Sequence, residues 1–331
     1  MSVRLSITDA EALANAALVR LGFDAEEAAI ATRHLIDAEL RGLGYAGFGR
    51  LVSIAEQIRK RGRSQQPIGI VKETPVSTRL DGGDQLGLIV AQRATEIAIA
   101  KAKTSGIAIV GASNTWYTGM LSYYAEQPAS HDLVTMIASN ATARVAPYGG
   151  NERRMGANPI CFGFPSADEP VVWDIGTSAV GHAQVTLARR LGTPLEEGVA
   201  FDPDGRPTTD PAAALAGAFA AWGGHRGSGL GIVVQLLGML AGSPMLPGEL
   251  QDFGFLIIAV QPGLLTPLDE FKKSVAGYAH HIRATRPVWP AWPLRMPFDR
   301  SRTERTARIE SRVIDIPDAI HSAIADIAAG H

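Results

Sequence analysis

The chain has 331 residues, enough to bury a large core and to form two domains. Its formal net charge is −2 and its basic residues are scattered, which excludes the electrostatic signature of a nucleic-acid-binding protein. A single cysteine, Cys161, excludes an intramolecular disulfide. Without a secretory signal or a long apolar run, the sequence predicts a cytoplasmic globular protein that does not enter a membrane.

The first helices are predicted from capping patterns. Thr8 and Glu11 have the spacing of a capping box, and the apolar residues after them keep helical spacing up to Gly22. Asp24 and Glu27 repeat this pattern and predict the start of a second helix.

The second helix carries His34, which we expect to be a packed or surface residue and not a functional one. A glycine-rich elbow follows at 42–49, and a third helix is predicted to end at Gly62. The N-terminal sixty residues therefore predict a helical unit.

Strands are predicted in the middle of the chain, at 68–71, 76–80, 106–110, 133–137, 160–164, 171–174 and 253–260. The sequence Asp81-Gly82-Gly83 predicts a turn. Several connections are too short for a crossover helix, which favours an α+β architecture over a doubly wound sheet. Helices are predicted at 181–190, 268–283, 300–311 and 315–329. The segment 287–293, rich in proline and tryptophan, is expected to cover a surface or a subunit contact.

A glycine-rich stretch at 222–231 precedes the apolar run 232–240, which is expected to be a buried helix. The N-terminus of such a helix favours an anion, most often a phosphate, and His225 and Arg226 add hydrogen-bond donors and charge. The alternative is that the glycines only allow close packing. Neither a Walker loop nor a Rossmann fingerprint has this spacing, so a nucleotide would bind in another fold.

Nine motifs, taken in order, resemble the type-2 malate/L-lactate dehydrogenase family from about residue 8 to residue 312. These motifs are Arg41-Gly42, Gly47 to Leu51, Asp81 to Gly83, Val145 to Gly150, Arg154 to Pro159, Asp174 to Ser178, Leu195 to Gly198, Asp204 to Pro211 and Gly223 to Gly227. The resemblance implies a small-molecule substrate and an NADPH or NADH cofactor. It also implies a non-Rossmann α+β fold, in which helical N- and C-terminal segments flank a large, mostly antiparallel sheet.

The resemblance also implies a homodimer and two domains. Residues 1–75, joined by 296–331, would form a helical substrate and dimer domain, and 76–295 would form the NAD(P)-binding domain. The residues placed beside the cofactor are Asn158, Gly223, Gly224, His225, Arg226, Gly227 and Ser228. Two local matches, at His182 and at 225–228, favour the branch of piperideine-2-carboxylate and pyrroline-2-carboxylate reductases. No metal site is expected.

The chain departs from its family where proton transfer is expected. The usual Ser-His pair of the elbow is replaced by Tyr45 and Ala46, a second histidine is missing near 115–117, and Gln184 replaces the reductase branch's aspartate. Oxidation of a 2-hydroxy acid needs a base, and its loss lowers the rate by about 10²–10⁴-fold. Reduction of a protonated imine needs less, because the carbon is already electrophilic.

The sequence therefore predicts an NAD(P)H-dependent reductase that acts on the C=N bond of a small carboxylated substrate, by direct hydride transfer. Tyr45, His182 and Tyr117 are the candidate catalytic residues, and Arg50 and Trp116 are expected to contact the substrate. The alternatives are packing for Tyr45 and Tyr117, a hydrogen-bonded structural role for His182 and a salt bridge on the helix surface for Arg50. Two other functions stay open: a 2-hydroxy-acid dehydrogenase with a relocated acid/base, and a nucleotide-binding homologue without activity.

Overall fold

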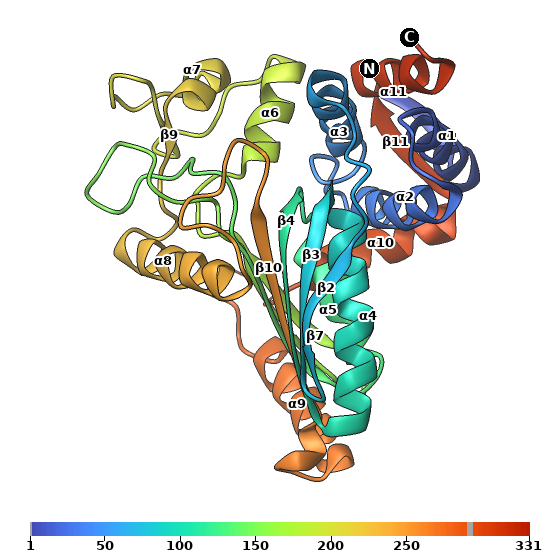
Figure 1. Cartoon of the computed structure of the whole chain (residues 1–331). Helices are drawn as coiled ribbons and strands as arrows, with labels where there is room; N and C mark the ends of the chain where they lie inside the picture. Colours follow the sequence, from blue (N-terminus) through green and yellow to red (C-terminus); the bar gives the residue numbers. More distant parts are fainter. Residues whose placement is uncertain (1, 290–293) are drawn as a thin grey trace.

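A computed structural model describes residues 2–289 and 294–331. A seven-stranded sheet forms its centre, in the order β2-β3-β4-β10-β5-β6-β7 (Figure 1). Only β3 and β4 pair in parallel, through the crossover helix α4 (Gly87–Ser105), and every other pair is antiparallel. The bounds are β2 Gly69–Thr74, β3 Ser77–Leu86, β4 Ile107–Trp116, β5 Val134–Ser139, β6 Ile160–Phe164, β7 Val171–Ile175 and β10 Phe253–Val260. The predicted α+β fold with a mostly antiparallel sheet is confirmed.

Helices cover both faces of this sheet. Helix α4 and helix α5 (Leu121–Ala129) cover one face, where alternate residues of β10, Phe255 and Ile257, are fully buried. Helix α8 (His225–Leu240) packs against the other face through Val234. Burial on both faces explains why the central strands are continuous apolar runs.

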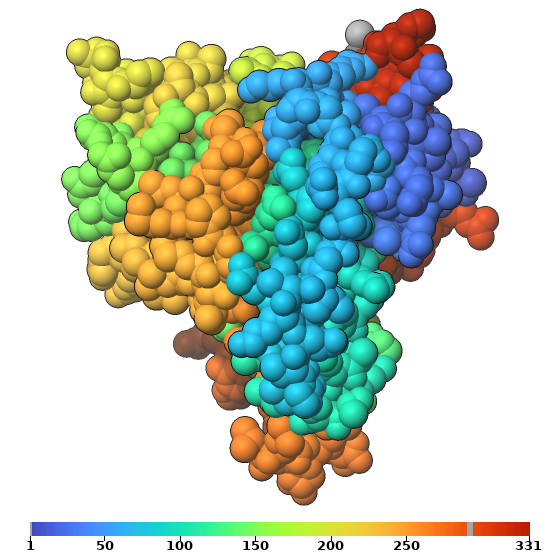
Figure 2. Space-filling view, viewed as in Figure 1, coloured from blue at the N-terminus to red at the C-terminus, as the bar shows by residue number. Residues whose placement is uncertain are grey.

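The first and last segments of the chain form a helical unit beside the sheet, seen as blue and red atoms in contact in Figure 2. It contains α1 Ile7–Arg20, α2 Ala25–Leu40, α3 Phe48–Arg61, α10 Asp299–Ser311 and α11 Asp318–Ala329. Strand β1 (Ser2–Ser6) pairs antiparallel with β11 (Val313–Pro317) and joins the two ends. The apolar cluster of this unit also takes in Leu86 of β3, Leu88 of α4 and Trp116 of β4. The division into two domains stays a prediction.

The helix starts are only partly as predicted. The capping box at Asp24 and Glu27 is confirmed, with both hydrogen bonds at 2.9 Å. The one at Thr8 and Glu11 is wrong, because α1 begins earlier and its cap is Ser6, whose hydroxyl oxygen accepts from the Asp9 amide.

Strand lengths account for three further corrections. The sequence Asp81-Gly82-Gly83 does not turn, since β3 continues to Leu86, and a β-carbon on Gly82 would lie 2.6 Å from the Asn114 carbonyl oxygen of β4. Strand β4 likewise runs on to Trp116. Residues 315–317 belong to β11 and not to the final helix.

A third group of elements forms the upper left part of Figure 1. It contains α6 His182–Leu191, β8 Ala200–Phe201, α7 Pro211–Ala216, β9 Ala218–Phe219 and α8. The expectation of a buried helix at 232–240 is wrong, because Ile232, Leu236 and Leu240 of α8 are between 50% and 70% exposed.

The remaining elements are a short 3-10 helix, Pro262–Leu264, and α9, Leu268–Arg283. The expectation for 287–293 includes 290–293, which lie outside the described residues. Within the described part of the chain, no helix has the length and apolar character needed to cross a membrane.

Candidate active site

A cavity of about 540 Å³ lies at one end of the sheet, against the helical unit. Strands β4, β5 and β7 end there and β6 and β10 begin there, since neighbouring strands are antiparallel. The loops that leave these strands therefore supply much of the wall. The elbow before α3 and the first turns of α6 and α10 complete it. The residues that carry chemistry in the lining are Tyr45, Arg50, Tyr117, Arg144, Asp174, His182 and Arg300.

Arg50 stands on α3, and its guanidinium carbon lies 3.9 Å from the centre of the Tyr117 ring. Its Nη1 atom is buried and has no hydrogen-bond partner among the residues that the structure describes. Burial lowers the pKa of Arg50 from its usual value, which leaves the group charged at neutral pH. A half-buried cation with an available donor at a cavity is suited to a carboxylate.

Tyr117 is held in the left-handed region of the backbone, with φ 51°, and its side chain is almost fully buried. This conformation is rare for a bulky residue. It follows directly on the last residue of β4, Trp116. The turn of the chain at Tyr117 aims its ring beneath Arg50.

Trp116, the other predicted substrate contact, does not line the cavity. It is 3% exposed, lies in the apolar cluster of the helical unit, and its indole nitrogen donates to the Asp84 carbonyl oxygen at 3.1 Å. In the structure Trp116 has a packing role, away from the cavity lining.

Tyr45 is half-buried in the elbow, at the cavity wall. Burial raises the pKa of its hydroxyl, the charge of Asp174 raises it further, and Arg300 and Arg50 oppose both. The phenol is therefore protonated at neutral pH and can donate a hydrogen bond. Ala46, the residue in the place of the family's histidine, also lines the cavity.

His182 is the first residue of α6. Burial holds its pKa well below the usual value, and the positive charge of Arg144 and then of Arg50 adds to this effect. The imidazole is neutral near pH 7 and has no proton to transfer as a cation. Gln184, in the place of the reductase branch's aspartate, accepts from the Gly181 amide at 2.7 Å and closes the start of α6.

Asp174 lies at the end of β7, in the cavity wall, and accepts from the Ser122 amide at 2.8 Å. The sequence marked Asp174 only as the first residue of one family motif and not as a candidate catalytic residue. Burial raises its pKa, so this carboxyl group also holds a proton more readily than an exposed aspartate. Arg144 and Arg300 were missed altogether, because each comes from a loop or helix start without a local signal.

The glycine-rich stretch lies next to the cavity, which Trp222 lines. Gly223 and Gly224 have φ values of 59° and 63°, and α8 begins directly after them at His225. A β-carbon on Gly223 would meet open space, so a ligand can approach the backbone there. Gly227 has the packing role instead, because its β-carbon would lie 1.8 Å from the Trp222 carbonyl oxygen.

The other predicted cofactor residues divide into exposed and supporting groups. Arg226 is exposed at the start of α8. Ser228 is buried, and its hydroxyl oxygen accepts from the Tyr148 amide at 3.0 Å. Asn158 is fully buried, and its amide nitrogen donates to the Gly231 carbonyl at 2.8 Å and to Gln235 at 2.9 Å. Asn158 therefore holds α8 against the sheet.

A larger hollow of about 860 Å³ lies where α9 meets α10. Charged groups in its wall are already paired: Arg283 donates to both oxygens of Asp299 at 2.8 Å, and His280 lies 3.1 Å from Asp168. None of the predicted site residues lines it.

Comparison with known proteins confirms the resemblance seen in the sequence. The model of the malate/L-lactate dehydrogenase family matches residues 5–325. L-sulfolactate dehydrogenase of Methanocaldococcus jannaschii is 32% identical over 280 residues, which cover 82% of this chain and 81% of that protein. The Delta(1)-pyrroline-2-carboxylate/Delta(1)-piperideine-2-carboxylate reductase of Pseudomonas putida is 30% identical over 324 residues, with 94% and 93% covered. The solved structure of a dehydrogenase from Sinorhizobium meliloti is similar with a TM-score of 0.91 at 31% identity, and covers 99% of this chain and 98% of that one.

Proposed function

The chain belongs to the malate/L-lactate dehydrogenase family and is an NAD(P)-dependent oxidoreductase, and from this premise we propose that it reduces the C=N bond of a small carboxylated substrate. One observation carries the proposal. The cavity offers a half-buried cation at Arg50, whose Nη1 has no hydrogen-bond partner among the described residues, while Ala46 stands where the family's proton-transfer histidine is expected. The site is thus equipped to bind a carboxylate, while the position of the family's histidine can no longer take a proton from a hydroxyl group.

The residues present fit a nicotinamide cofactor. The cavity has the volume of a small-ligand site. Trp222 in its wall is followed in the chain by Gly223, where the backbone is open, and by the exposed Arg226 at the N-terminus of a 16-residue helix. Backbone amides, helix dipole and the arginine charge together favour phosphate groups. When bound, the cofactor supplies the hydride.

The protein's own residues then have distinct roles. Arg50 binds the substrate carboxylate through its free Nη1 donor, and the Tyr117 ring beneath it fixes the direction of the guanidinium. Tyr45 donates a hydrogen bond, and a proton where the imine arrives unprotonated, to the substrate nitrogen. His182 acts as a neutral hydrogen-bonding group. A protonated imine needs no further acid, because hydride addition gives a neutral amine.

The test measures binding and turnover separately. Purified protein is titrated with NADPH and with NADH by fluorescence, and is then assayed with piperideine-2-carboxylate, pyrroline-2-carboxylate and pyruvate. We expect binding of at least one cofactor, turnover of a cyclic imine and little reduction of pyruvate. Cofactor binding with pyruvate reduction and no imine turnover would contradict the proposal.

Asp174 supports a second candidate function, oxidation of a 2-hydroxy acid. A carboxyl group in the cavity wall, with its pKa raised by burial, has the properties of a relocated base. L-Sulfolactate dehydrogenase is among the relatives. This candidate predicts oxidation of lactate- or malate-like substrates that depends on Asp174.

We also propose that two copies of the chain form a homodimer. The outer face of α8 supports it, with Ile232, Val233, Leu236 and Leu240 exposed in one stretch. Light scattering would give the mass of a dimer, and Leu236→Glu would shift it toward the monomer if this face is the interface. A cytoplasmic location stays a prediction.

A further inference from the structure

Phe298 has a backbone conformation that its side chain disfavours. It is the residue before α10, with φ 74° and ψ −8°, in the left-handed region. A β-carbon is strained there, which is why glycine and asparagine are the residues usually found. Strain of this kind persists where the surrounding structure requires the residue.

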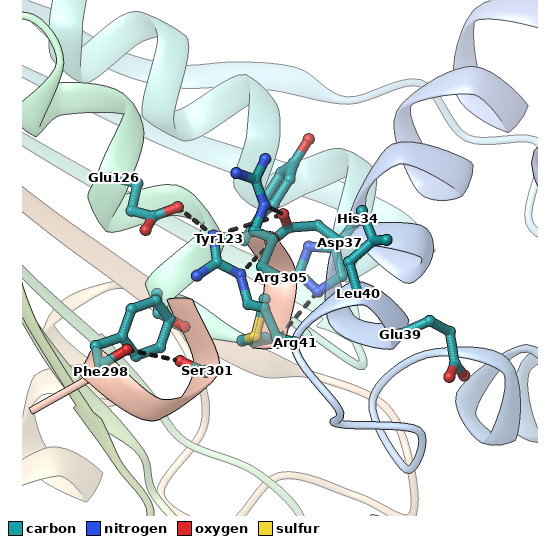
Figure 3. A network of polar contacts seen from close by, with 12 residues as sticks. His34, Asp37, Glu39, Leu40, Arg41, Tyr123, Glu126, Phe298, Ser301 and Arg305 are labelled. Atoms are coloured by element: carbon teal, nitrogen blue, oxygen red, sulfur yellow. Dashed lines mark hydrogen bonds and ion pairs between the residues drawn. The ribbon is translucent and has the colours of Figure 1, made fainter. Parts of the chain in front are cut away.

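The ring of Phe298 covers a buried guanidinium, as Figure 3 shows. The Arg41 guanidinium carbon lies 4.7 Å from the ring centre, and Arg41 is only 1% exposed. Its Nε donates to Asp37 at 2.6 Å and its Nη2 to Glu126, while Nη1 is buried without a hydrogen-bond partner in the described part of the chain. Carboxylates thus fix the guanidinium in place, and the guanidinium in turn fixes the ring.

The backbone of Phe298 is held as well. Its carbonyl oxygen accepts from the Ser301 hydroxyl at 3.0 Å, one turn into α10 (Figure 3). The start of α10 is anchored further by Asp299, which binds Arg283 through both oxygens. The aromatic ring therefore has a defined position and little freedom to move away.

The half-buried ring lines the same cavity as Arg50. Other apolar residues in the lining are Leu43, Tyr45, Met120, Leu250 and Phe253. A substrate held by its carboxylate at Arg50 would find apolar side chains around its remaining atoms. A second carboxylate or a sulfonate placed against the Phe298 ring itself would lose its hydration without gaining a partner from the ring, although Arg144 and Arg300 line other parts of the cavity.

We propose that Phe298 is a specificity-determining residue, whose ring packs against the hydrocarbon part of the substrate and selects cyclic ketimine carboxylates over compact substrates. The inference rests on the proposed imine reduction, and it names the substrate class of that site. Arg41 is a positioning residue, because it acts only through the ring that it holds.

The test compares Phe298→Gly with the wild-type protein. Glycine removes the wall and relieves the backbone, so the variant should fold. The readout is the ratio of kcat/KM for piperideine-2-carboxylate to kcat/KM for the open-chain imine of pyruvate and methylamine. We expect the ratio to fall by about tenfold or more, since a single methylene contact in an apolar pocket is worth about 10–200-fold. Phe298→Leu should restore part of the lost preference, with a ratio between those of Phe298→Gly and the wild type.

A matched control lies at the other end of the same helix. Arg312 follows α10 with φ 57° and an exposed side chain, so Arg312→Gly relieves the same kind of strain away from the cavity. Its ratio should equal that of the wild type. If Phe298→Gly fails to fold, Phe298→Asn tolerates the left-handed backbone and carries the same expectation.

A ratio within twofold of wild type in a folded variant at position 298 would overturn the proposal, as would a leucine variant no better than glycine. If the wild-type protein reduces no imine, the proposed function fails by itself. The role of Phe298 is then measured with 2-oxo acids, as the preference for 2-oxohexanoate over the compact diacid oxaloacetate. The same direction of change is expected there, and its absence would overturn the inference.

Discussion

The guanidinium carbon of Arg50 lies 3.9 Å above the centre of the Tyr117 ring, and a nitrogen of the same group is buried without a partner among the described residues. Leaving a charged donor unsatisfied costs free energy unless something binds there in the working protein. The Tyr117 ring fixes the direction of the guanidinium, and the Nη1 donor stays available to a ligand. It is the feature of the cavity from which the binding of a carboxylate follows most directly.

Replacement of Arg50 by alanine should therefore raise KM for a carboxylated substrate by about 10- to 100-fold, the worth of a hydrogen bond to a charged group. The value of kcat should change less. Tyr117→Phe keeps the ring and should remain within about twofold of wild type. Steady-state kinetics measure both. Arg59→Ala, on the same helix but away from the cavity, is the control, and an equal effect there would refute the assignment.

Asp174→Asn separates the two candidate reactions. Asparagine keeps an oxygen that can accept from the Ser122 amide, so the start of α5 should stay intact. It removes the titrating group whose pKa burial raises. Imine reduction should survive this change within a few-fold, whereas oxidation of a 2-hydroxy acid that uses Asp174 as its base should fall by about 10²-fold or more. Loss of imine reduction with unchanged thermal stability would show that Asp174 serves that reaction too.

Two glycines of α8 form a matched pair of substitutions. A β-carbon at Gly227 would lie 1.8 Å from the Trp222 carbonyl oxygen, whereas one at Gly229 would meet nothing within 4 Å. Gly227→Ala should displace the glycine-rich loop, lower the unfolding free energy by about 1–3 kcal/mol and weaken cofactor binding. Gly229→Ala should leave binding unchanged and stabilise the helix by up to about 1 kcal/mol. Urea unfolding and fluorescence titration measure the two effects, and equal behaviour of the variants would contradict the prediction.

Acid should destabilise the protein through His34. Burial lowers the pKa of this histidine from 6.5 to about 3, and its Nε2 accepts from the Met120 amide at 3.0 Å. The unfolded chain therefore binds a proton between pH 6.5 and 3 that the folded chain does not, and stability falls as pH falls through this window. His34→Gln should flatten the dependence by up to about 1.4 kcal/mol per pH unit.

The comparison must be made between variants, because Glu39 acts in the opposite direction. Burial raises the pKa of Glu39 from 4.5 to about 7, so its contribution to stability is lost as pH rises through that range. Glu39 is present in both the wild type and His34→Gln, so its effect cancels when the pH dependence of the unfolding free energy is compared between them. His281→Gln, at an exposed position of α9, is the control and should leave the slope as it is. If the slope of unfolding free energy against pH were unchanged in His34→Gln, the acid destabilisation could not be assigned to His34.

Local patterns predicted the parts of the fold that local interactions determine. The capping box at Asp24 and the break before α8 at Gly224 were found because each depends on a few adjacent residues. The pairing of β1 with β11 was not, since it joins segments more than 300 residues apart in the chain. The sequence marked Gly82 as a turn residue. Glycine is needed there because the backbone of β4 approaches closely, and this tertiary contact leaves no local pattern.

The candidate site shows the same division. Tyr45, Arg50, Tyr117 and His182 line one cavity, although only a resemblance in the order of motifs had linked them. Trp116 precedes Tyr117 directly, and the centres of the two rings lie 5.5 Å apart in the same apolar cluster, but only Tyr117 also lines the cavity. The left-handed backbone at Tyr117 has no sequence signature in tyrosine. Phe298 was missed for a related reason, because nothing in the sequence marks a phenylalanine in a left-handed conformation.

The pairing of β1 with β11 also sets an order on synthesis. Strand β1 is translated about 300 residues before its partner at 313–317. The central sheet, complete at Val260, can form while α1 and α2 still lack the strand and helix that close their unit. Arg50 stands on α3 of that unit, so the cavity is completed only after residues 313–317 have been translated. A chain that stops before residue 313 would keep its sheet and lose its binding site.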